Sequence, residues 1–411
     1  MTHDDLRRAG FKDRTRVAAA RETLLEAVDP HERTQRIQLG RADGRTVAET
    51  VTAPNPVPGY DRAAMDGWAV RAEDTFGASD RSPKILREGD ERVVPGETVR
   101  VHTGSELPDG ADAVVMVEQT ESVGDEVEVF DGVAEGENVG PVGEDVAEGA
   151  SLYEPGHRLR PSDLGLLKSV GLSEVEVYDH PTVGVIPTGE ELVQADPQPG
   201  EVIETNGLTV SHMVSRWGGV PTYRDVVTDD PEAIRAAIQR DLTKDVIILT
   251  GGSSVGERDY TPEVVDELGE VLVHGVALKP GHPVALGVVE DTPVLMLPGY
   301  PVACIINAVQ FLRPVLKHVG HLPDEPQPTT EATLARKITS EPGTRTFVRV
   351  RVEETENEEG EAERTATPTR ASGSGVLSSV ALADGWVVVP EGREGIAAGE
   401  TVAVEDWEWS A

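Results

Sequence analysis

The sequence predicts a multidomain protein of α/β and β type. It combines one doubly wound α/β domain, a β-rich domain, a helical or mixed linking domain and a C-terminal β domain. The 411 residues exceed one ordinary domain. From Pro181 onward, apolar strand-like runs alternate with helix-like segments, the rhythm of a parallel sheet covered by helices. Valine-rich runs separated by Gly, Pro and Asp fill residues 46–150 and 329–411, which favours β structure there.

We therefore expect four domains. A discontinuous N-terminal linking domain is predicted for residues 1–46 with 144–180, and a β-rich domain for residues 47–143. The α/β domain is predicted for residues 181–324 and the C-terminal β domain for residues 325–411. The proline-rich segment 323–328 is predicted to be a linker, and the acidic segment 353–369 a solvated loop.

Apolar periodicity and turn residues predict the individual elements. Helices are expected within residues 12–29 and at 161–170, 208–217, 232–241 and 302–319. In the N-terminal half, strands are expected at 92–94, 98–101, 113–117 and 126–130. In the C-terminal half, strands are expected at 182–186, 222–227, 245–249, 347–352, 385–389 and 400–404. Asp66 and Gly67 form either a hairpin turn or part of a more particular motif.

Three glycine- and proline-containing loops within about fifty residues are the strongest functional signal. They are Thr250–Gly256, Lys279–Pro283 and Leu297–Pro301, and they follow the apolar runs 246–249, 276–278 and 294–296. Such runs are typical of buried parallel strands that end at one edge of a sheet, where α/β proteins bind ligands. After the first loop, Thr261 is expected to cap a helix whose first residue is Pro262. Glycine loops beside a helix start indicate a phosphorylated ligand.

Several carboxylates are expected at or just after the strand ends of this domain: Glu190, Glu191, Asp229, Asp230 and Asp259. Asp229 or Asp230 is expected to cap a helix. The others favour a Mg²⁺-assisted phosphate site at the same edge. Lys279, a rare lysine in this chain, is held in a loop stiffened by proline and is a candidate anion ligand; the alternative is an ordinary surface lysine.

The charge excludes some functions. Seventy-four acidic and 37 basic residues give a net charge of −37, spread along the chain rather than gathered in a tail or patch. This favours an acidic surface that stays soluble at high salt, as in halophiles, and argues against nucleic-acid binding.

The one cysteine, Cys304, is expected to be a buried thiol. Because the sequence shows neither the apolar core of a signal peptide near Met1 nor an apolar run of membrane-spanning length, we expect a cytoplasmic protein.

Taken together, these motifs resemble the MoeA family, the molybdopterin molybdenumtransferases that include the gephyrin E domain. The matching segments cover nearly the whole chain. They are 64–67 (AMDG), 102–104 (HTG), 143–145 (GED), 187–192 (PTGEEL), 251–256 (GGSSVG) with 259–260, 279–281 (KPG) and 297–299 (LPG). A GGxSxG sequence alone is weak, since it also occurs in related adenylyltransferases.

The resemblance implies a MogA-like α/β domain, an elongated β-rich domain, a C-terminal β-barrel-like domain and a homodimer whose active site combines both subunits. It implies insertion of molybdate into adenylylated molybdopterin with release of AMP, assisted by Mg²⁺. A molybdopterin adenylyltransferase and apo-molybdoenzymes are implied as possible partners, without nucleic acid or membrane. The implied catalytic residues are Asp66, Asp145, Glu191, Asp229, Asp259 and Lys279, of which Glu191, Asp229 and Asp259 bind the metal. The implied binding residues are Thr103, Gly251, Gly252, Ser253, Ser254, Gly256, His282, Pro298, Gly299, Arg345 and Ser374.

The chain departs from the family pattern at the expected oxyanion site. His282 stands where a second lysine is usual, Tyr300 where asparagine is usual and Ala303 where serine is usual. An arginine before Gly143 is absent, and Gly275 replaces a lysine. These changes leave a non-catalytic carrier or scaffold for molybdopterin as one alternative and tungstate-specific insertion as another. A bare nucleotide-binding or pyrophosphatase activity is a further alternative, although it would leave the AMDG motif without a role.

Overall fold

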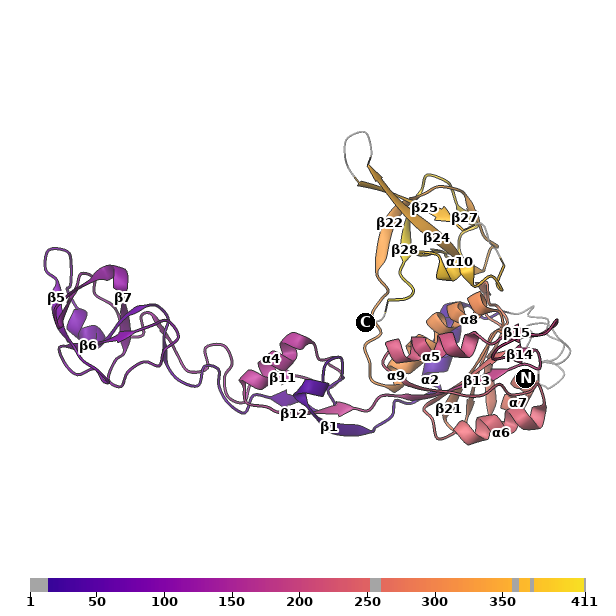
Figure 1. Ribbon diagram of the computed structural model, residues 1–411, viewed down its shortest axis with the longest axis horizontal. Helices are drawn as coiled ribbons and strands as arrows, with labels where there is room; N and C mark the ends of the chain where they lie inside the picture. The colour runs from indigo at the N-terminus through magenta and orange to yellow at the C-terminus, as the bar shows by residue number, and fades with distance from the viewer. Residues whose placement is uncertain (1–13, 252–259, 357–361, 370–372, 410–411) are drawn as a thin grey trace. The chain divides into compact units, whose positions relative to one another are not determined.

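The computed structural model describes residues 14–251, 260–356, 362–369 and 373–409 (Figure 1). The chain divides into two compact units, which we treat separately. The α/β unit comprises Met1–Arg33 and Tyr178–Ala411, and the N-terminal-half unit comprises Thr34–Val177. This division differs from the expected linking domain, because helix α2 (Val17–Glu26) packs its residues Val17 and Leu24 into the core of the α/β unit.

A six-stranded sheet forms the centre of the α/β unit. Its strand order is β16-β13-β17-β21-β20-β18. The bounds are β16 Val220–Tyr223, β13 Thr182–Thr188, β17 Val246–Gly251, β21 Thr292–Leu297, β20 Ala285–Val289 and β18 Glu270–His274. The first four strands are parallel, and β20 runs antiparallel to both of its neighbours. The sheet is therefore mixed, although its central strands have the predicted parallel arrangement.

Helices cover both faces of this sheet (Figure 1). Strand β17 directs Val246 and Ile248 into one core, and Ile247 and Leu249 into the other, because side chains alternate along a strand. The first core contains α2, α5 (Asn206–Arg216), α8 (Pro301–Asn307) and α9 (Arg313–Val319), with a π-helical turn at Ala308–Leu312 between the last two. The second contains α6 (Pro231–Asp241) and α7 (Thr261–Leu268). This is the predicted doubly wound domain.

The second glycine loop does not follow a strand at 276–278 as predicted. Strand β18 ends at His274, and Gly275, with φ of +89°, turns the chain into the loop. Residues Leu278–Lys279 instead form the short strand β19, which pairs with the C-terminal sheet. Because β18 is antiparallel to β20, and β20 to β21, strand β18 has the same direction as β21. The Lys279 loop therefore still leaves from the predicted edge.

Two smaller predictions also need correction. Strand β16 ends at Tyr223, although Val227 makes an isolated parallel bridge to Thr188. The residue that caps α7 is Tyr260, and Thr261 is already the first helical residue. Asp230 caps α6 as expected, since its side chain accepts a hydrogen bond from Ala233 N at 3.0 Å. The helix formed by residues 301–319 is the one helix in the described ranges that is long and apolar enough to cross a membrane, and 94% of its 18-residue apolar stretch is buried inside the protein.

The C-terminal residues form a closed β structure. Strands are paired in the order β24-β25-β22-β28-β26, and β24 also pairs with β26, which closes the ring. The bounds are β22 Thr329–Leu334, β23 Ile338–Thr339, β24 Arg345–Glu356, β25 Ala362–Pro368, β26 Gly385–Val389, β27 Gly395–Ile396 and β28 Thr401–Glu405, with α10 at Ser378–Ala381. The acidic segment 353–369 is thus largely strand, not the predicted loop; its residues 357–361 lie outside the described ranges. Strands β24 and β25 pair antiparallel there, and the high acidic content of the segment hid this pairing in the sequence.

The N-terminal-half unit is mainly β structure, as predicted. Its six-stranded sheet has the order β7-β4-β6-β5-β9-β8. The bounds are β4 Gly67–Val70, β5 Lys84–Glu88, β6 Glu97–Val101, β7 Ala113–Met116, β8 Thr120–Val123 and β9 Glu126–Val129, with α3 at Ala72–Thr75. Residues 92–94, predicted as a strand, form none. Asp66–Gly67 is not a hairpin turn, because β3 (Arg62–Ala63) pairs with β10 (Val139–Gly140) and β4 pairs with β6 and β7.

A smaller mixed region of the same unit combines segments from both ends of residues 34–177. It contains β1 (Thr34–Gln38), β2 (Val51–Thr52), β11 (Ser151–Tyr153), α4 (Pro161–Ser169) and β12 (Glu174–Tyr178). Strand β1 pairs with β12 and β2 with β11. Its core includes Leu39, Val47, Leu159 and Leu167. This region combines segments from both ends of residues 34–177, whereas the linking domain was predicted to begin at residue 1.

Candidate functional site

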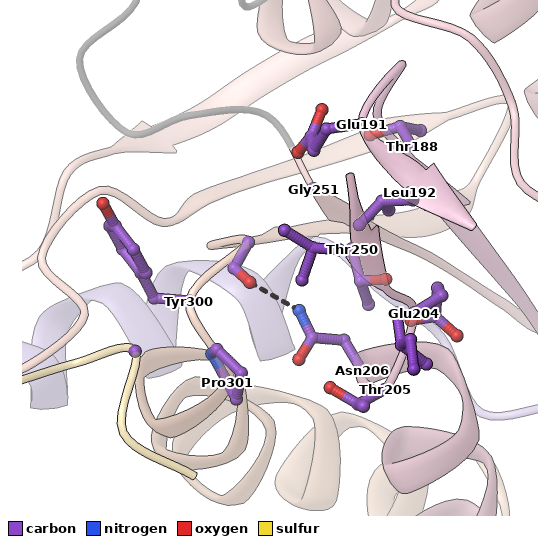
Figure 2. A pocket seen from close by; sticks show the side chains of 14 residues that line it. Thr188, Glu191, Leu192, Glu204, Thr205, Asn206, Thr250, Gly251, Tyr300 and Pro301 are labelled. Atoms are coloured by element: carbon purple, nitrogen blue, oxygen red, sulfur yellow. Dashed lines mark hydrogen bonds between the residues drawn. The ribbon is translucent and has the colours of Figure 1, made fainter. Parts of the chain in front are cut away.

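A pocket opens where strands β13 and β17 end. We call it the strand-end pocket; its volume is about 330 Å³. Thr188, Thr250 and Gly251 line it from the strand ends, and residues 204–206 and 299–301 line it from two loops (Figure 2). Gly251 has φ of +146°, and a Cβ atom there would lie 1.9 Å from the carbonyl oxygen of Thr188. Only glycine permits this close approach, so the chain reaches the glycine loop directly beside β13.

The wall formed by the start of α5 was not predicted from the sequence. Glu204 is 5% exposed, and its Oε1 accepts a hydrogen bond from Gly207 N at 2.6 Å. The hydroxyl of Tyr223 donates to Oε2 of the same carboxylate. Asn206 donates from Nδ2 to the carbonyl oxygen of Gly299 at 2.8 Å. The sequence predicted a helix at 208–217, but it gave no sign that Glu204 is buried, because one carboxylate carries little information in so acidic a chain.

Carboxylates gather beside the strand-end pocket, as expected. Glu191 lines the pocket. Burial raises the pKa of Asp229, and the negative charges of Glu191 and Glu190 raise it further, although a 3.4 Å hydrogen bond from Glu190 N opposes the shift. Like charges held together in this way favour a cation between them. The described residues contain no group of three or more metal-binding side chains. The other predicted residues of this region, Gly252, Ser253, Ser254, Gly256 and Asp259, lie outside the described ranges.

A second pocket, which we call the basic pocket, has a volume of about 560 Å³. Four predicted residues line it together: Lys279, His282, Pro298 and Ser374. They come from two glycine loops and from the C-terminal β region, which are far apart in sequence. Tyr300 lines both this pocket and the strand-end pocket. Ala303, one of the departures from the family pattern, also lines the basic pocket.

The positive charge of the basic pocket comes from Lys279 and Arg349, and a third basic residue, His282, also lines the pocket. Lys279 is half-exposed, and its Nζ lies 2.9 Å from Oε1 of Glu341. Arg349 is 6% exposed, and burial lowers its pKa, yet an arginine stays charged at neutral pH. Burial lowers the pKa of His282, and the positive charges of Arg14 and Lys279 lower it further, whereas Glu341 opposes them. His282 is therefore neutral at pH 7 in the free protein.

Arg349, rather than Arg345, is the arginine of this pocket. Arg345 is not one of the described lining residues, and its Nε and Nη2 both lie 3.2 Å from Oε2 of Glu391. Arg349 lies four residues further along β24 and lines the pocket directly. The sequence motif contains both arginines within five residues, and nothing in its spacing distinguishes the one held by a glutamate.

The remaining predicted residues belong to the N-terminal-half unit. Asp66 is exposed, and its Oδ1 accepts hydrogen bonds from Thr103 N at 2.6 Å and Thr103 Oγ1 at 2.8 Å. These two bonds lower the pKa of Asp66. Asp145 is also exposed, and its backbone N donates to the carbonyl oxygen of Val57. The structure thus brings Asp66 and Thr103 together. That these two residues and Asp145 take part in the functional site remains a prediction.

Comparisons with known proteins cover nearly the whole chain. Residues 15–171 match the MoeA N-terminal region (domain I and II), residues 184–318 match a family described as "Probable molybdopterin binding domain", and residues 331–407 match the MoeA C-terminal region (domain IV). A Methanocaldococcus jannaschii protein named for molybdopterin biosynthesis is 39% identical over 93% of this chain and 94% of its own. The molybdopterin molybdenumtransferase of Bacillus subtilis is 32% identical over 89% and 90%. The crystal structure of a molybdopterin biosynthesis MoeA protein from Pyrococcus horikoshii superimposes with a TM-score of 0.78, at 31% identity, over 95% of this chain and 99% of that one.

Proposed function

The chain belongs to the MoeA family of molybdopterin molybdenumtransferases, and we propose that it joins molybdate to adenylylated molybdopterin and releases AMP. One observation carries this proposal: two pockets of different chemistry adjoin each other and share Tyr300. The strand-end pocket has carboxylates and the start of a glycine loop. The basic pocket has the cationic side chains. A phosphorylated pterin and a tetrahedral oxyanion need these two environments side by side.

In this proposal, the strand-end pocket and the glycine loop hold the pterin phosphate and the AMP linkage, with Lys279 at the adjoining rim. Backbone N–H groups of such loops bind phosphate oxygens, and a lysine contributes a point charge. Thr188 and Thr250 supply hydroxyl groups at the strand ends. Their placement on strands supports a fixed position for the phosphates, because strand ends in a packed sheet move little.

Glu191 and Asp229 are proposed to hold Mg²⁺, with Asp259 as the third carboxylate. The raised pKa of Asp229, caused by burial and by neighbouring carboxylates, fits an environment that a cation would stabilise. The ion would polarise the phosphoanhydride and neutralise its charge. The protein's own part is to hold the carboxylates of Glu191 and Asp229 close together.

We place molybdate in the basic pocket, where Arg349, His282 and Ser374 surround it. Arg349 offers a fixed cation, and the Ser374 hydroxyl offers a hydrogen-bond donor. An arriving dianion raises the pKa of His282, so that its imidazole takes up a proton and becomes a third positive group. These residues hold the oxyanion beside the dithiolene sulfurs. No protein nucleophile is required, since positioning and charge stabilisation lower the barrier.

We further propose a cytoplasmic homodimer in which Asp66, Thr103 and Asp145 of one subunit complete the site of the other. The two hydrogen bonds that Thr103 donates to Asp66 support a pre-formed carboxylate at an exposed surface. A molybdopterin adenylyltransferase would supply the substrate, and apo-molybdoenzymes would receive the product.

A carrier or scaffold without turnover is the second candidate. Its support is the reduced charge of the basic pocket: Lys279 is paired with Glu341, and His282 is neutral before a ligand arrives. Tungstate in place of molybdate is compatible with the same pocket, because the two oxyanions have the same charge and shape. A turnover assay separates these candidates.

The test of the site compares two arginines of one strand. Arg349→Lys should raise the KM for molybdate about tenfold and leave the KM for adenylylated molybdopterin unchanged, because lysine lacks the guanidinium geometry. Arg345→Lys is the matched control, and its KM for molybdate should change less than twofold. Ser374→Ala should also raise the KM for molybdate. Equal effects of the two arginine variants would place the oxyanion elsewhere.

A further inference from the structure

Tyr300 occupies the boundary between the two pockets and presents an aromatic ring to both. Its side chain lines the strand-end pocket and the basic pocket. The residue is 55% exposed, although each of the six residues from Val302 to Asn307 behind it is buried. Figure 2 shows the ring at one side of the strand-end pocket, with Leu192 and Glu191 across from it. Its hydroxyl group makes no hydrogen bond with the residues that the structure describes.

Two contacts fix the position of this ring. The preceding carbonyl, Gly299 O, accepts the 2.8 Å hydrogen bond from Asn206, which ties the loop to α5 (Figure 2). On the other side, a Cβ atom at Gly375 would lie 3.3 Å from Cδ1 and 3.6 Å from Cε1 of the tyrosine. The ring therefore lies against the backbone of the C-terminal region at a residue that has no side chain. Tyr300 also caps α8, whose first residue, Pro301, restricts the backbone.

The rim of the strand-end pocket opposite the Tyr300 ring is apolar. Leu192, Val202 and Ile203 line it, and Val202 and Ile203 are 56% and 45% exposed. A flat ligand that entered between this rim and the tyrosine would bury apolar surface on both faces. Aromatic residues make up only 4% of the chain, so an exposed ring at a pocket boundary differs from the aliphatic composition elsewhere.

We infer that Tyr300 stacks on a planar nitrogen heterocycle of the substrate and sets its position between the two pockets. This inference rests on the proposed function, whose substrate contains two such rings, the pterin and the adenine. Stacking suits both rings, since each has a π-face and neither needs a specific hydrogen bond for the contact. Tyr300 is thus a substrate-binding residue that this chain adds at the point where phosphate and oxyanion sites adjoin.

The experiment measures the Kd of adenylylated molybdopterin by calorimetry for the full-length protein and three variants. Tyr300→Leu removes the ring and should weaken binding about tenfold. Tyr300→Phe keeps the ring and should bind within about twofold of the parent. Phe76→Leu is the matched control: it removes another exposed ring, 60% exposed, from the N-terminal-half unit and should leave binding unchanged. Thermal unfolding of each variant checks that Tyr300→Leu is folded.

Two further ligands identify which ring is stacked. If Tyr300→Leu weakens AMP binding, the ring is adenine; if it weakens the binding of molybdopterin without AMP, the ring is pterin. Either result supports the inference. Unchanged affinity for all three ligands in folded Tyr300→Leu overturns it. If Tyr300→Leu weakens substrate binding but the parent protein releases no AMP, the transferase proposal fails and stacking is supported. If the parent protein releases AMP but Tyr300→Leu binds the substrate as tightly as the parent, stacking fails and the transferase proposal is supported.

Discussion

Asn206 donates a 2.8 Å hydrogen bond from Nδ2 to the carbonyl oxygen of Gly299, and so joins two loops that lie 93 residues apart in the sequence. One loop begins helix α5, and the other connects β21 to α8. This bond lies in the wall of the strand-end pocket, and its acceptor residue, Gly299, directly precedes Tyr300 in the sequence (Figure 2). It makes the shape of the pocket depend on one side-chain amide.

Replacing Asn206 by Ala should therefore raise the KM for adenylylated molybdopterin. A neutral hydrogen bond of this kind contributes about 1 kcal/mol, which corresponds to about a fivefold change. Asn206→Asp should have a larger effect, because a carboxylate cannot donate to the carbonyl and repels it. Steady-state kinetics would measure both. Leu208→Ala, at a 51% exposed position of the same helix, is the control. A KM equal to that of the parent in both Asn206 variants would show that this hydrogen bond does not set the shape of the pocket.

Tyr223→Phe should lower the free energy of unfolding by about 1–3 kcal/mol. The variant removes the hydroxyl that donates to Glu204, and so leaves a 5% exposed carboxylate with one donor fewer. Burial and the hydrogen bond to Glu204 raise the pKa of Tyr223, which agrees with a hydroxyl that stays protonated. Urea unfolding would measure the change. Tyr60→Phe, whose hydroxyl is 3.5 Å from its acceptor at an exposed position, should change stability by less than about 0.5 kcal/mol.

The sequence predicted the doubly wound domain well because its signals are local. The apolar run 246–249 and the pair Asp230–Pro231 specify a buried strand and a helix start within a few residues. Sequence patterns failed to predict the structure where a segment pairs with residues that are far away in the sequence. Residues 276–278 are as apolar as a sheet strand, yet Leu278 pairs with Arg345 of the C-terminal region. Likewise, only the folded chain shows that Glu391 holds Arg345 and that Arg349 lines the pocket.

A network around Asp163 should make stability depend on acid. Burial alone would raise the pKa of Asp163, but hydrogen bonds from Arg160 and His157 outweigh it and hold the pKa well below the ordinary value. A carboxyl with a depressed pKa in the folded state stabilises the protein above its unfolded-state pKa of about 4, and this contribution is lost as the pH falls further.

The variant Asp163→Asn tests this network. Urea unfolding at several pH values should show the parent more stable by a constant amount above about pH 5, with the difference shrinking below about pH 4. A difference that stays constant down to about pH 3 would mean that Asp163 titrates normally. His157→Asn would show whether the histidine carries part of the shift.

His282 should couple anion binding to proton uptake. Burial and the neighbouring positive charges lower its pKa in the free protein, and a bound dianion raises it, so affinity for molybdate should increase as the pH falls from about 8 to about 6. Calorimetry in two buffers with different ionisation enthalpies would count the proton. His282→Lys carries a permanent charge and should bind more tightly with a flatter pH dependence. The same slope in both proteins would exclude His282 as an anion ligand.

The net charge of −37 should make stability depend on salt. Self-repulsion weakens as salt screens the surface, so the Tm should rise by several degrees between dilute buffer and molar KCl. Differential scanning calorimetry over a KCl series would measure this. A Tm that does not change with salt would contradict the halophilic interpretation and leave the charge as a solubility feature only.

The most direct test of the central claim is a turnover assay with both products followed in one reaction. Purified protein in molar KCl is mixed with adenylylated molybdopterin, Mg²⁺ and either molybdate or tungstate. We predict AMP release that saturates with one of the two oxyanions and activates an apo-molybdoenzyme in equal amount. Tight substrate binding by folded protein without oxyanion-dependent AMP release would contradict the transferase and favour the carrier.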